Sequence, residues 1–258
     1  MVKKILKIVL WVITGAALVV LFAFGRKHYL ETPLKGIHFE LERNHKSGFV
    51  QKDSVISHAE AICDLEHQAA IGSVNLTKIQ QLLDGNPWIE KSSAYIGLND
   101  TLNIKAKEYE PVLRVFNQDR RSVYVTQDGV IFPSSPHYSP RVIIASGNFM
   151  FPTPGKSSCV TDSIYAQTGI SEALTIAMTI NQDPFLTENI GQIYRNENKE
   201  YELMVNNVSA RVILGDTIAV DDKLSRLAIL LDKYSGTEEL ATYKTLNLKY
   251  NNQIVCTK

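Results

Sequence analysis

The longest apolar run of the chain lies near its N-terminus, where Ile8–Gly25 gives 18 residues without a charged side chain. As a helix it would be about 27 Å long, close to the hydrocarbon thickness of a bilayer. Lysines precede it and Arg26 and Lys27 follow it, so the basic residues at its two ends are nearly balanced. Because the short tail needs no translocation, the pattern predicts a cytoplasmic tail at 1–7 and a type II transmembrane helix at 8–25.

A cleaved secretory signal is the alternative for this segment, because it also has a basic start and an apolar stretch. The apolar region of such a signal is usually ~7–15 residues long, shorter than 8–25. Ala23-Phe24-Gly25 is only a passable cleavage site, and a basic pair follows it directly. We therefore favour a retained anchor. Both readings place most of the chain outside the cytoplasm.

The next part of the chain alternates between patterns of strand and helix. Apolar and polar residues alternate at Ile37–Leu41, which predicts a half-buried strand. One helix is expected near Asp53, whose carboxylate would cap it, and a second helix between Asn75 and Gly85. Strands are expected at 88–96 and 102–109. This order predicts a β-α-α-β-β domain at 32–109, with a three-stranded sheet covered by two helices.

The remainder, 110–258, is richer in strands. Gln127-Asp128-Gly129 between two apolar runs predicts a hairpin, and Leu224, Leu227 and Leu231 give one helix a core face. Strands are predicted at 112–116, 122–126, 130–132, 141–145, 192–195, 200–205, 208–214 and 243–256, and helices at 164–180 and 221–234. The fold class is thus α+β, with a mixed β domain, flanking helices and a C-terminal edge strand.

Composition and motifs argue against several functions. Lysine plus arginine equals aspartate plus glutamate, at 27 each, so no net field attracts nucleic acid. The 3 cysteines and 6 histidines are scattered and show neither a disulfide framework nor the spacing of a metal site. No recognised nucleophile, phosphate-binding or dinucleotide-binding motif is present. We expect no catalytic residue, cofactor, metal or small-molecule substrate. A membrane-tethered envelope enzyme with an unrecognised site remains an alternative.

Several motifs, in order, resemble one protein family. Asn86-Pro87-Trp88-Ile89-Glu90, followed by Leu102–Val112 with its Glu-Tyr-Glu-Pro boundary, resembles the junction of the POTRA and β domains in the bacterial cell-division family FtsQ (DivIB). The stretches that resemble later family motifs are Tyr124–Phe132, Pro140–Gly147, Leu214–Asp216 and Thr245–Tyr250. Each motif is weak alone, but five in order behind one apolar anchor are specific.

The resemblance implies a non-enzymatic scaffold of the division machinery in the inner membrane. Its folded part would lie in the periplasm, be enriched at the division septum, and contain a POTRA domain at 32–109. Members of the family hold FtsB-like and FtsL-like coiled-coil partners, and the partner adds a strand beside the last strand of the β domain. A translocation factor of the POTRA type is a second alternative, but it would normally repeat that domain or carry a long barrel.

The partner-binding residues expected from the resemblance lie near the C-terminus. Tyr250 is the first choice, because a half-exposed tyrosine offers a large contact area and a hydroxyl group. Asn252, Gln253 and Ile254 would follow on the same strand edge, and Lys249 could pair with a carboxylate of the partner. Lys249 replaces the arginine common in the family. The alternative for Tyr250 is that it only packs on the preceding helix.

Overall fold

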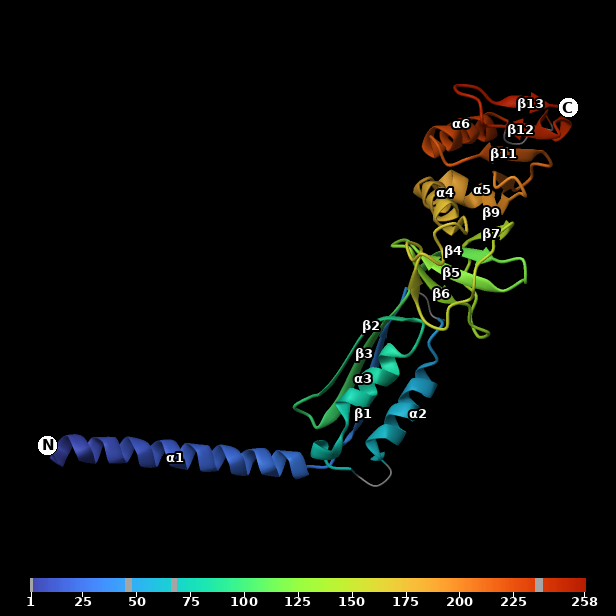
Figure 1. Ribbon diagram of the computed structural model, residues 1–258. Helices are drawn as coiled ribbons and strands as arrows, with labels where there is room; N and C mark the ends of the chain where they lie inside the picture. Colours follow the sequence, from blue (N-terminus) through green and yellow to red (C-terminus); the bar gives the residue numbers. More distant parts are fainter. Residues whose placement is uncertain (1, 45–47, 66–68, 235–238) are drawn as a thin grey trace. The chain divides into compact units, whose positions relative to one another are not determined.

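The computed structural model describes residues 2–44, 48–65, 69–234 and 239–258. The chain divides into two compact units (Figure 1). Unit 1 contains 1–44 and 50–108, and unit 2 contains 45–49 and 109–258. We describe each unit by itself.

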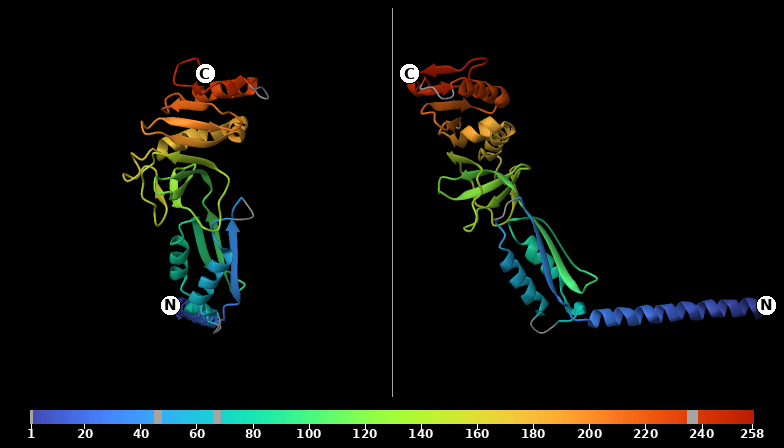
Figure 2. Two further views of the ribbon diagram at one scale, coloured as in Figure 1. Left: turned by 90° about the vertical axis from the view of Figure 1, so that its right-hand side faces the viewer. Right: turned by 180° about the vertical axis from the view of Figure 1, so that it is seen from behind.

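Unit 1 begins with α1 (Val2–Glu31), a helix of 30 residues (Figure 2). Its segment Val9–Glu31 is long and apolar enough to cross a membrane. The side chains at 9–28 are exposed, so the apolar surface of this stretch is not used for packing inside the described chain, whereas the last turn of the helix lies against η2. The helix also continues past Gly25, where the predicted transmembrane helix ends, as far as Glu31.

A three-stranded sheet forms the rest of unit 1. The elements after α1 are β1 (Gly36–Glu42), α2 (Lys52–Cys63), the 3-10 helix η2 (Ile71–Ser73), α3 (Leu76–Asp84), β2 (Ile89–Ile96) and β3 (Thr101–Glu108). β3 is the central strand, parallel to β1 and antiparallel to β2. Phe39, Leu102 and Ile104 from the sheet form one core with Ala59 of α2 and Ile79 of α3. The elements of unit 1 thus follow the order β-α-α-β-β, with η2 between the two α-helices, and both helices contribute to the core of the sheet.

The N-terminal caps of α2 and α3 differ, because only α3 has a side chain that bonds to its first turn. Asn75 caps α3 as predicted, because its side chain accepts a hydrogen bond from the Lys78 amide at 3.0 Å. The expectation for Asp53 is wrong, since Gln51 occupies the cap position of α2 and makes no side-chain bond there. Asp53 lies inside the first turn instead, where a carboxylate still interacts favourably with the helix dipole.

Unit 2 is built on one large mixed sheet. Its elements are β4 (Pro111–Phe116), β5 (Ser122–Thr126), β6 (Val130–Pro133), β7 (Ile143–Gly147), β8 (Ser158–Cys159), α4 (Ile170–Gln182), α5 (Pro184–Asn189), β9 (Ile190–Arg195), β10 (Tyr201–Val205), β11 (Arg211–Gly215), α6 (Val220–Lys233), the 3-10 helix η3 (Glu239–Thr242), β12 (Thr245–Asn247) and β13 (Val255–Thr257). Within the described residues the strand order is β13-β12-β11-β10-β9-β7-β4-β5-β6-β8.

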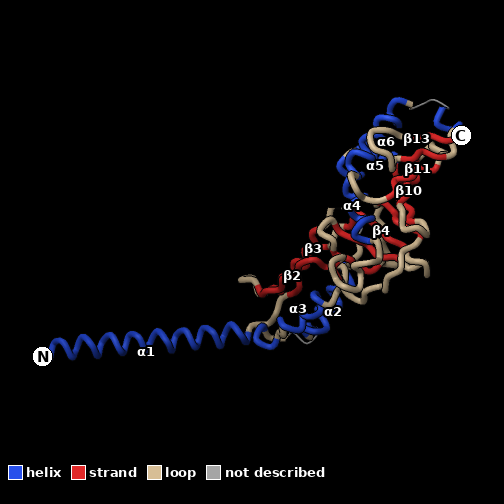
Figure 3. Tube along the Cα trace, turned by 45° about the horizontal axis from the view of Figure 1, so that its top comes forward, coloured by secondary structure: helices blue, strands red, loops and turns tan. Residues whose placement is uncertain are grey.

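The core of unit 2 lies between the sheet and the helices α4, α5 and α6, which Figure 3 shows along one side of the strands. Ile193, Leu203 and Val212 from three neighbouring strands are fully buried there, together with Ala177 of α4 and Leu227 of α6. The mixed β domain with flanking helices is therefore present, and β13 is a C-terminal edge strand.

The helix predicted at 164–180 is shorter at its start and is followed by another. It begins at Ile170 because Gly169 has a φ of +85°, a backbone conformation that glycine adopts without strain. Asp183 caps the end of α4, and its carboxylate then accepts a hydrogen bond from the Phe185 amide at 2.9 Å. Pro184 therefore begins α5, which the sequence pattern did not indicate.

Candidate partner-binding edge

The sheet of unit 2 ends at β13, which pairs antiparallel with β12 and places Cys256 opposite Leu246. The hydroxyl groups of Thr245 and Thr257 are hydrogen-bonded across the two strands. In the described part of the chain, β13 is the last strand in the order, so no strand pairs with its outer side. An open edge of this kind can accept a strand from another chain through main-chain hydrogen bonds.

The prediction of one continuous last strand from Tyr243 to Cys256 is wrong. Strand pairing is limited to 245–247 and 255–257, and the intervening residues form a turn. The Asn247 side chain accepts a hydrogen bond from the Lys249 amide at 3.0 Å, which directs the chain out of the sheet. Asn252 then adopts a φ of +57°, which asparagine tolerates better than most residues. We call residues 248–253 the C-terminal turn.

Arg226 of α6 fixes the C-terminal turn. Its Nη1 donates hydrogen bonds to the carbonyl oxygens of Tyr250 at 2.9 Å and Gln253 at 2.6 Å. Its Nη2 makes a longer contact of 3.4 Å to the carbonyl oxygen of Leu248, and its Nε donates to Asp222 at 3.0 Å. A planar guanidinium can satisfy carbonyl groups on both arms of a turn at once. Arg226 therefore determines where the chain re-enters the sheet as β13.

Lys249 points to the neighbouring part of the sheet. Its Nζ lies 2.9 Å from the Glu200 carboxylate, directly before β10. Its stem crosses Gly215, where a β-carbon would lie 2.6 Å from Lys249 Cγ, so only glycine leaves room for it. The hydrogen bond with Glu200 raises the pKa of Lys249, because the carboxylate favours the charged form of the amine. Lys249 thus has a carboxylate partner within its own chain, and a pair with a carboxylate of a partner protein stays a prediction.

The start of α6 is held by a second ion pair. Lys223 is buried, and its Nζ lies 2.8 Å from the Asp216 carboxylate and 3.0 Å from the Asp216 carbonyl oxygen. The hydrogen bond from Lys223 lowers the pKa of Asp216. Because Arg226 follows Lys223 by about one helical turn, this pair also sets the position of the arginine that binds the C-terminal turn.

The structure separates the other residues expected at the edge. Tyr250 is 49% exposed, and only its carbonyl oxygen is held by Arg226. Asn252 and Gln253 are exposed in the turn, so they do not lie on a strand as the sequence pattern suggested. Ile254 is partly buried and packs on the core of unit 2. The edge itself is formed by 255–257, which sequence reasoning did not select.

Two other surface features of the described residues, a groove in unit 1 and a hollow on α1, offer few groups that could take part in a reaction. A groove of about 220 Å³ in unit 1 lies between α2 and the turn before β2, beside Val55, His58 and Trp88. The His58 ring is bonded to the Ser54 carbonyl oxygen of its own helix at 2.6 Å. No three His, Cys, Asp or Glu side chains in the described ranges form a group that could hold a metal, and His45 and His67 lie outside those ranges.

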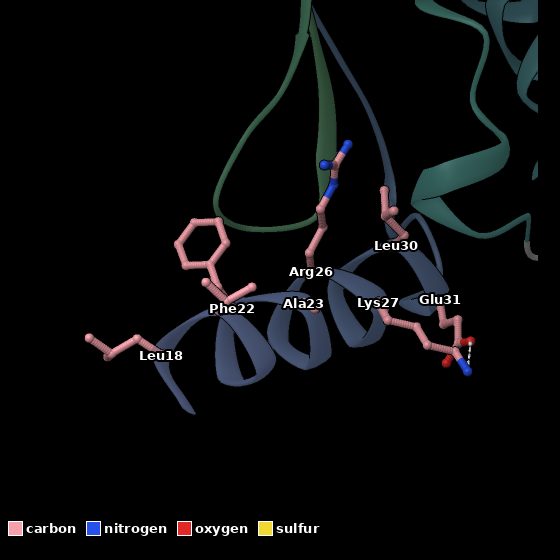
Figure 4. A pocket seen from close by; sticks show the side chains of 8 residues that line it. Leu18, Phe22, Ala23, Arg26, Lys27, Leu30 and Glu31 are labelled. Atoms are coloured by element: carbon pink, nitrogen blue, oxygen red, sulfur yellow. Dashed lines mark ion pairs between the residues drawn. The ribbon is translucent and has the colours of Figure 1, made fainter. Parts of the chain in front are cut away.

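A hollow on the surface of α1 is bounded by that helix alone. Figure 4 shows Leu18, Phe22, Ala23 and Leu30 along its flank, with Lys27 paired to Glu31 at 3.9 Å. Because one helix cannot enclose a ligand, this surface is a helix flank and not a binding cavity. Its apolar side chains are of the kind that face lipid in a membrane helix.

The fold and the edge define an α+β protein that carries an apolar N-terminal helix and a large β-sheet with an open terminal strand. A family model described as FtsQ/DivIB, C-terminal related, matches residues 110–257, more than half of the 258 residues. The chain therefore belongs to the FtsQ/DivIB family. No curated protein matches it. The family consists of non-enzymatic division proteins, so the match indicates a role in cell division.

Proposed function

We propose that this chain is a non-enzymatic scaffold of the division machinery that links early and late division proteins. The family match over unit 2 and the apolar helix α1 support this role. In the proposal, α1 crosses the inner membrane and both units lie in the periplasm, concentrated at the division septum. Three lysines precede the apolar run and two basic residues directly follow it, and this small excess favours a cytoplasmic N-terminus.

We propose further that unit 1 serves as a POTRA domain. Its order of elements, β-α-α-β-β, and its central β3 between β1 and β2 are the features on which the proposal rests. The family match begins at residue 110 and does not cover unit 1. A docking role toward other membrane proteins of division is therefore proposed from topology and from the resemblance at its C-terminal end.

The central proposal is that an FtsB/FtsL-type partner binds at the C-terminal edge of unit 2 by strand addition. The observation that carries it is the open outer side of β13 within a domain of this family. Main-chain bonds along a three-residue strand are few, so side chains beside it must add affinity and specificity. Tyr250, 49% exposed in the adjoining turn, is the best-placed aromatic for this.

This arrangement changes the roles of the expected residues. Tyr250, Asn252 and Gln253 would flank the added strand from the turn, while Ile254 would support β13 from the core side. Lys249, already paired with Glu200, would keep the turn near the sheet and contribute little directly to affinity.

Co-purification of an FtsB-like partner with the full-length protein from membranes tests the proposal. The Thr257 carbonyl oxygen accepts a hydrogen bond from the Lys244 amide on the β12 side, so the neighbouring Cys256 amide faces the open side of β13. Cys256→Pro should therefore reduce capture strongly, because proline removes the backbone donor that an added strand would use and is tolerated where the lost amide faces solvent. Tyr250→Ala should weaken capture by about 1–2 kcal/mol, or roughly 5–30-fold in Kd, as for a moderately buried interface aromatic.

Ile229→Ala is the matched control, since Ile229 is an exposed apolar residue of α6 in the same unit, at 69%. Its capture should equal that of the unmodified chain. Thermal unfolding identifies a variant that merely fails to fold. Undiminished capture by folded Cys256→Pro and Tyr250→Ala proteins would exclude strand addition at this edge.

A further inference from the structure

The topology of unit 1 places one turn of the sheet beside the end of α1. The helix ends at Glu31 and β1 starts at Gly36, so β1 starts at the end of the sheet next to the helix. β3 runs parallel to β1, with Thr101 opposite Gly36, and β2 is antiparallel to β3. The turn between β2 and β3, residues 97–100, therefore lies at this same end.

Hydrogen bonds and an ion pair join that turn to the residues that follow α1. The Lys35 amide donates to the Asp100 carbonyl oxygen at 2.8 Å, and Lys35 Nζ lies 2.9 Å from the Asp100 carboxylate. Within the turn, the Gly97 amide donates to the Thr101 carbonyl oxygen at 2.9 Å. The turn is thus held at a fixed place relative to the first residues after the helix.

The segment around η2 completes this end of unit 1. The Ile71 amide donates to the Thr32 carbonyl oxygen at 2.8 Å, and the Leu34 amide donates to the Ala69 carbonyl oxygen at 3.0 Å. A β-carbon on Gly72 would lie 3.0 Å from the Leu30 carbonyl oxygen, so η2 packs closely against the last turn of α1. The helix end is consequently attached to the unit through hydrogen bonds and packing, in addition to the covalent chain.

Leu98 is the apolar tip of the 97–100 turn. Its relative exposure is 102%, so its side chain makes no packing contact in the described chain. A single exposed leucine is ordinary on a protein surface, and the position of this one is what distinguishes it. Turn tips usually carry Gly, Asn, Asp or Ser. The one carboxylate of the turn, Asp100, is neutralised by Lys35.

We propose that Leu98 inserts into the lipid headgroup layer and forms a second membrane contact of unit 1. The four residues from Glu31 to Lys35 span at most ~14 Å, so Asp100, which is bonded to Lys35, lies within about that distance of the helix end. From Asp100 the chain can carry Leu98 about 7 Å further, on the side of the helix end. Arg26 and Lys27, in the last turns of α1, are cations suited to lipid phosphates near this depth. Such a contact would limit rotation of unit 1 about the anchor. The inference rests on the proposed membrane insertion of α1.

Spin labelling of the full-length protein in vesicles of phosphatidylethanolamine and phosphatidylglycerol tests this contact. In a background of Cys63→Ala, Cys159→Ser and Cys256→Ser, one cysteine is introduced by Leu98→Cys and labelled with a nitroxide. Its collision rates with oxygen, which concentrates in lipid, and with a water-soluble nickel complex are then compared. We expect the oxygen-to-nickel ratio at 98 to exceed by several-fold that of an exposed aqueous site.

Two reference labels separate this inference from the proposed anchor. Ile218→Cys, at a residue 73% exposed in unit 2, reports water, and Phe22→Cys, at a residue 79% exposed on α1, reports the hydrocarbon. A ratio at 98 equal to that at 218, with a lipid ratio at 22, would overturn the Leu98 contact alone. Aqueous ratios at both 22 and 98 would overturn the anchor and the contact together.

Discussion

Replacing Arg226 should free the C-terminal turn while leaving the rest of unit 2 folded. Arg226→Ala removes the two short hydrogen bonds to the carbonyl oxygens of Tyr250 and Gln253. A hydrogen bond from a charged donor stabilises by roughly 1.5–3 kcal/mol when buried. These carbonyls lie at the surface and regain water, so we take about 1 kcal/mol for each bond. The 3.4 Å contact to Leu248 adds little.

The expected loss is therefore about 2 kcal/mol in the free energy of opening the turn, which corresponds to roughly 30-fold faster exchange of its amide hydrogens. Hydrogen exchange with mass spectrometry on peptides covering 246–258 measures this directly. Peptides from α4 should exchange as in the unmodified chain, because a local change opens the turn before the core.

Asp222→Asn is the matched control for this prediction. It removes only the exposed partner of Arg226 Nε, a pair worth about 0.5 kcal/mol or less, and should accelerate exchange about twofold. Unchanged exchange at 246–258 in Arg226→Ala would refute the role of the arginine. Equal acceleration in α4 would show a global loss of stability instead.

Two further predictions concern the stability of unit 2. Gly147 has a φ of +104°, and a β-carbon there would lie 2.2 Å from the Arg195 carbonyl oxygen, so Gly147→Ala should destabilise by about 3 kcal/mol in denaturant unfolding. Gly155→Ala, with nothing within 4 Å of the added carbon, should be nearly neutral, and equal effects of the two changes would contradict this reasoning. The lowered pKa of Asp216 means that its pair with Lys223 stabilises the fold above the usual pKa of an aspartate and ceases to do so as pH falls through the lowered value. Asp216→Asn should therefore cost about 1 kcal/mol at pH 7, and the stabilities of the two proteins should converge as the pH falls through the lowered pKa of Asp216; a constant difference at every pH would count against the pair.

The long regular elements were predictable because their patterns are local. The helix at 8–25 and the strands before and after Gly129 can be predicted from the spacing of apolar residues and from the residues that form the turn. The hairpin is present as β5 and β6, with Gly129 at a φ of +78°. Family resemblance, confirmed over 110–257, identified the domain from motifs that are individually weak.

The C-terminal edge was less predictable because long-range contacts decide it. Leu246 and Leu248 suggested a continuing strand, and both are indeed buried, but the chain leaves the sheet after Asn247. The contacts of Arg226 with the turn join residues 22–27 positions apart, which no local period reveals. Asn251-Asn252 indicates a turn, but the alternation of apolar and polar residues before it favoured a strand.

Lys249 shows the same limit for a side chain. Its sequence context suggested a charge available to a partner, whereas Glu200, 49 positions away, binds it in the folded chain. That contact depends on β11 lying between β12 and β10, with Gly215 of β11 leaving space for the lysine stem.

Hydrogen exchange of β13 with and without the FtsB/FtsL-type pair tests the central claim most directly. An added strand would bond to the outer side of β13, so exchange of the amides at 255–257 should slow when the pair binds the full-length protein. β8, the strand at the opposite edge of the described sheet, should be unaffected. Binding of the pair with unchanged exchange at 255–257, or with protection only at β8, would contradict strand addition at this edge.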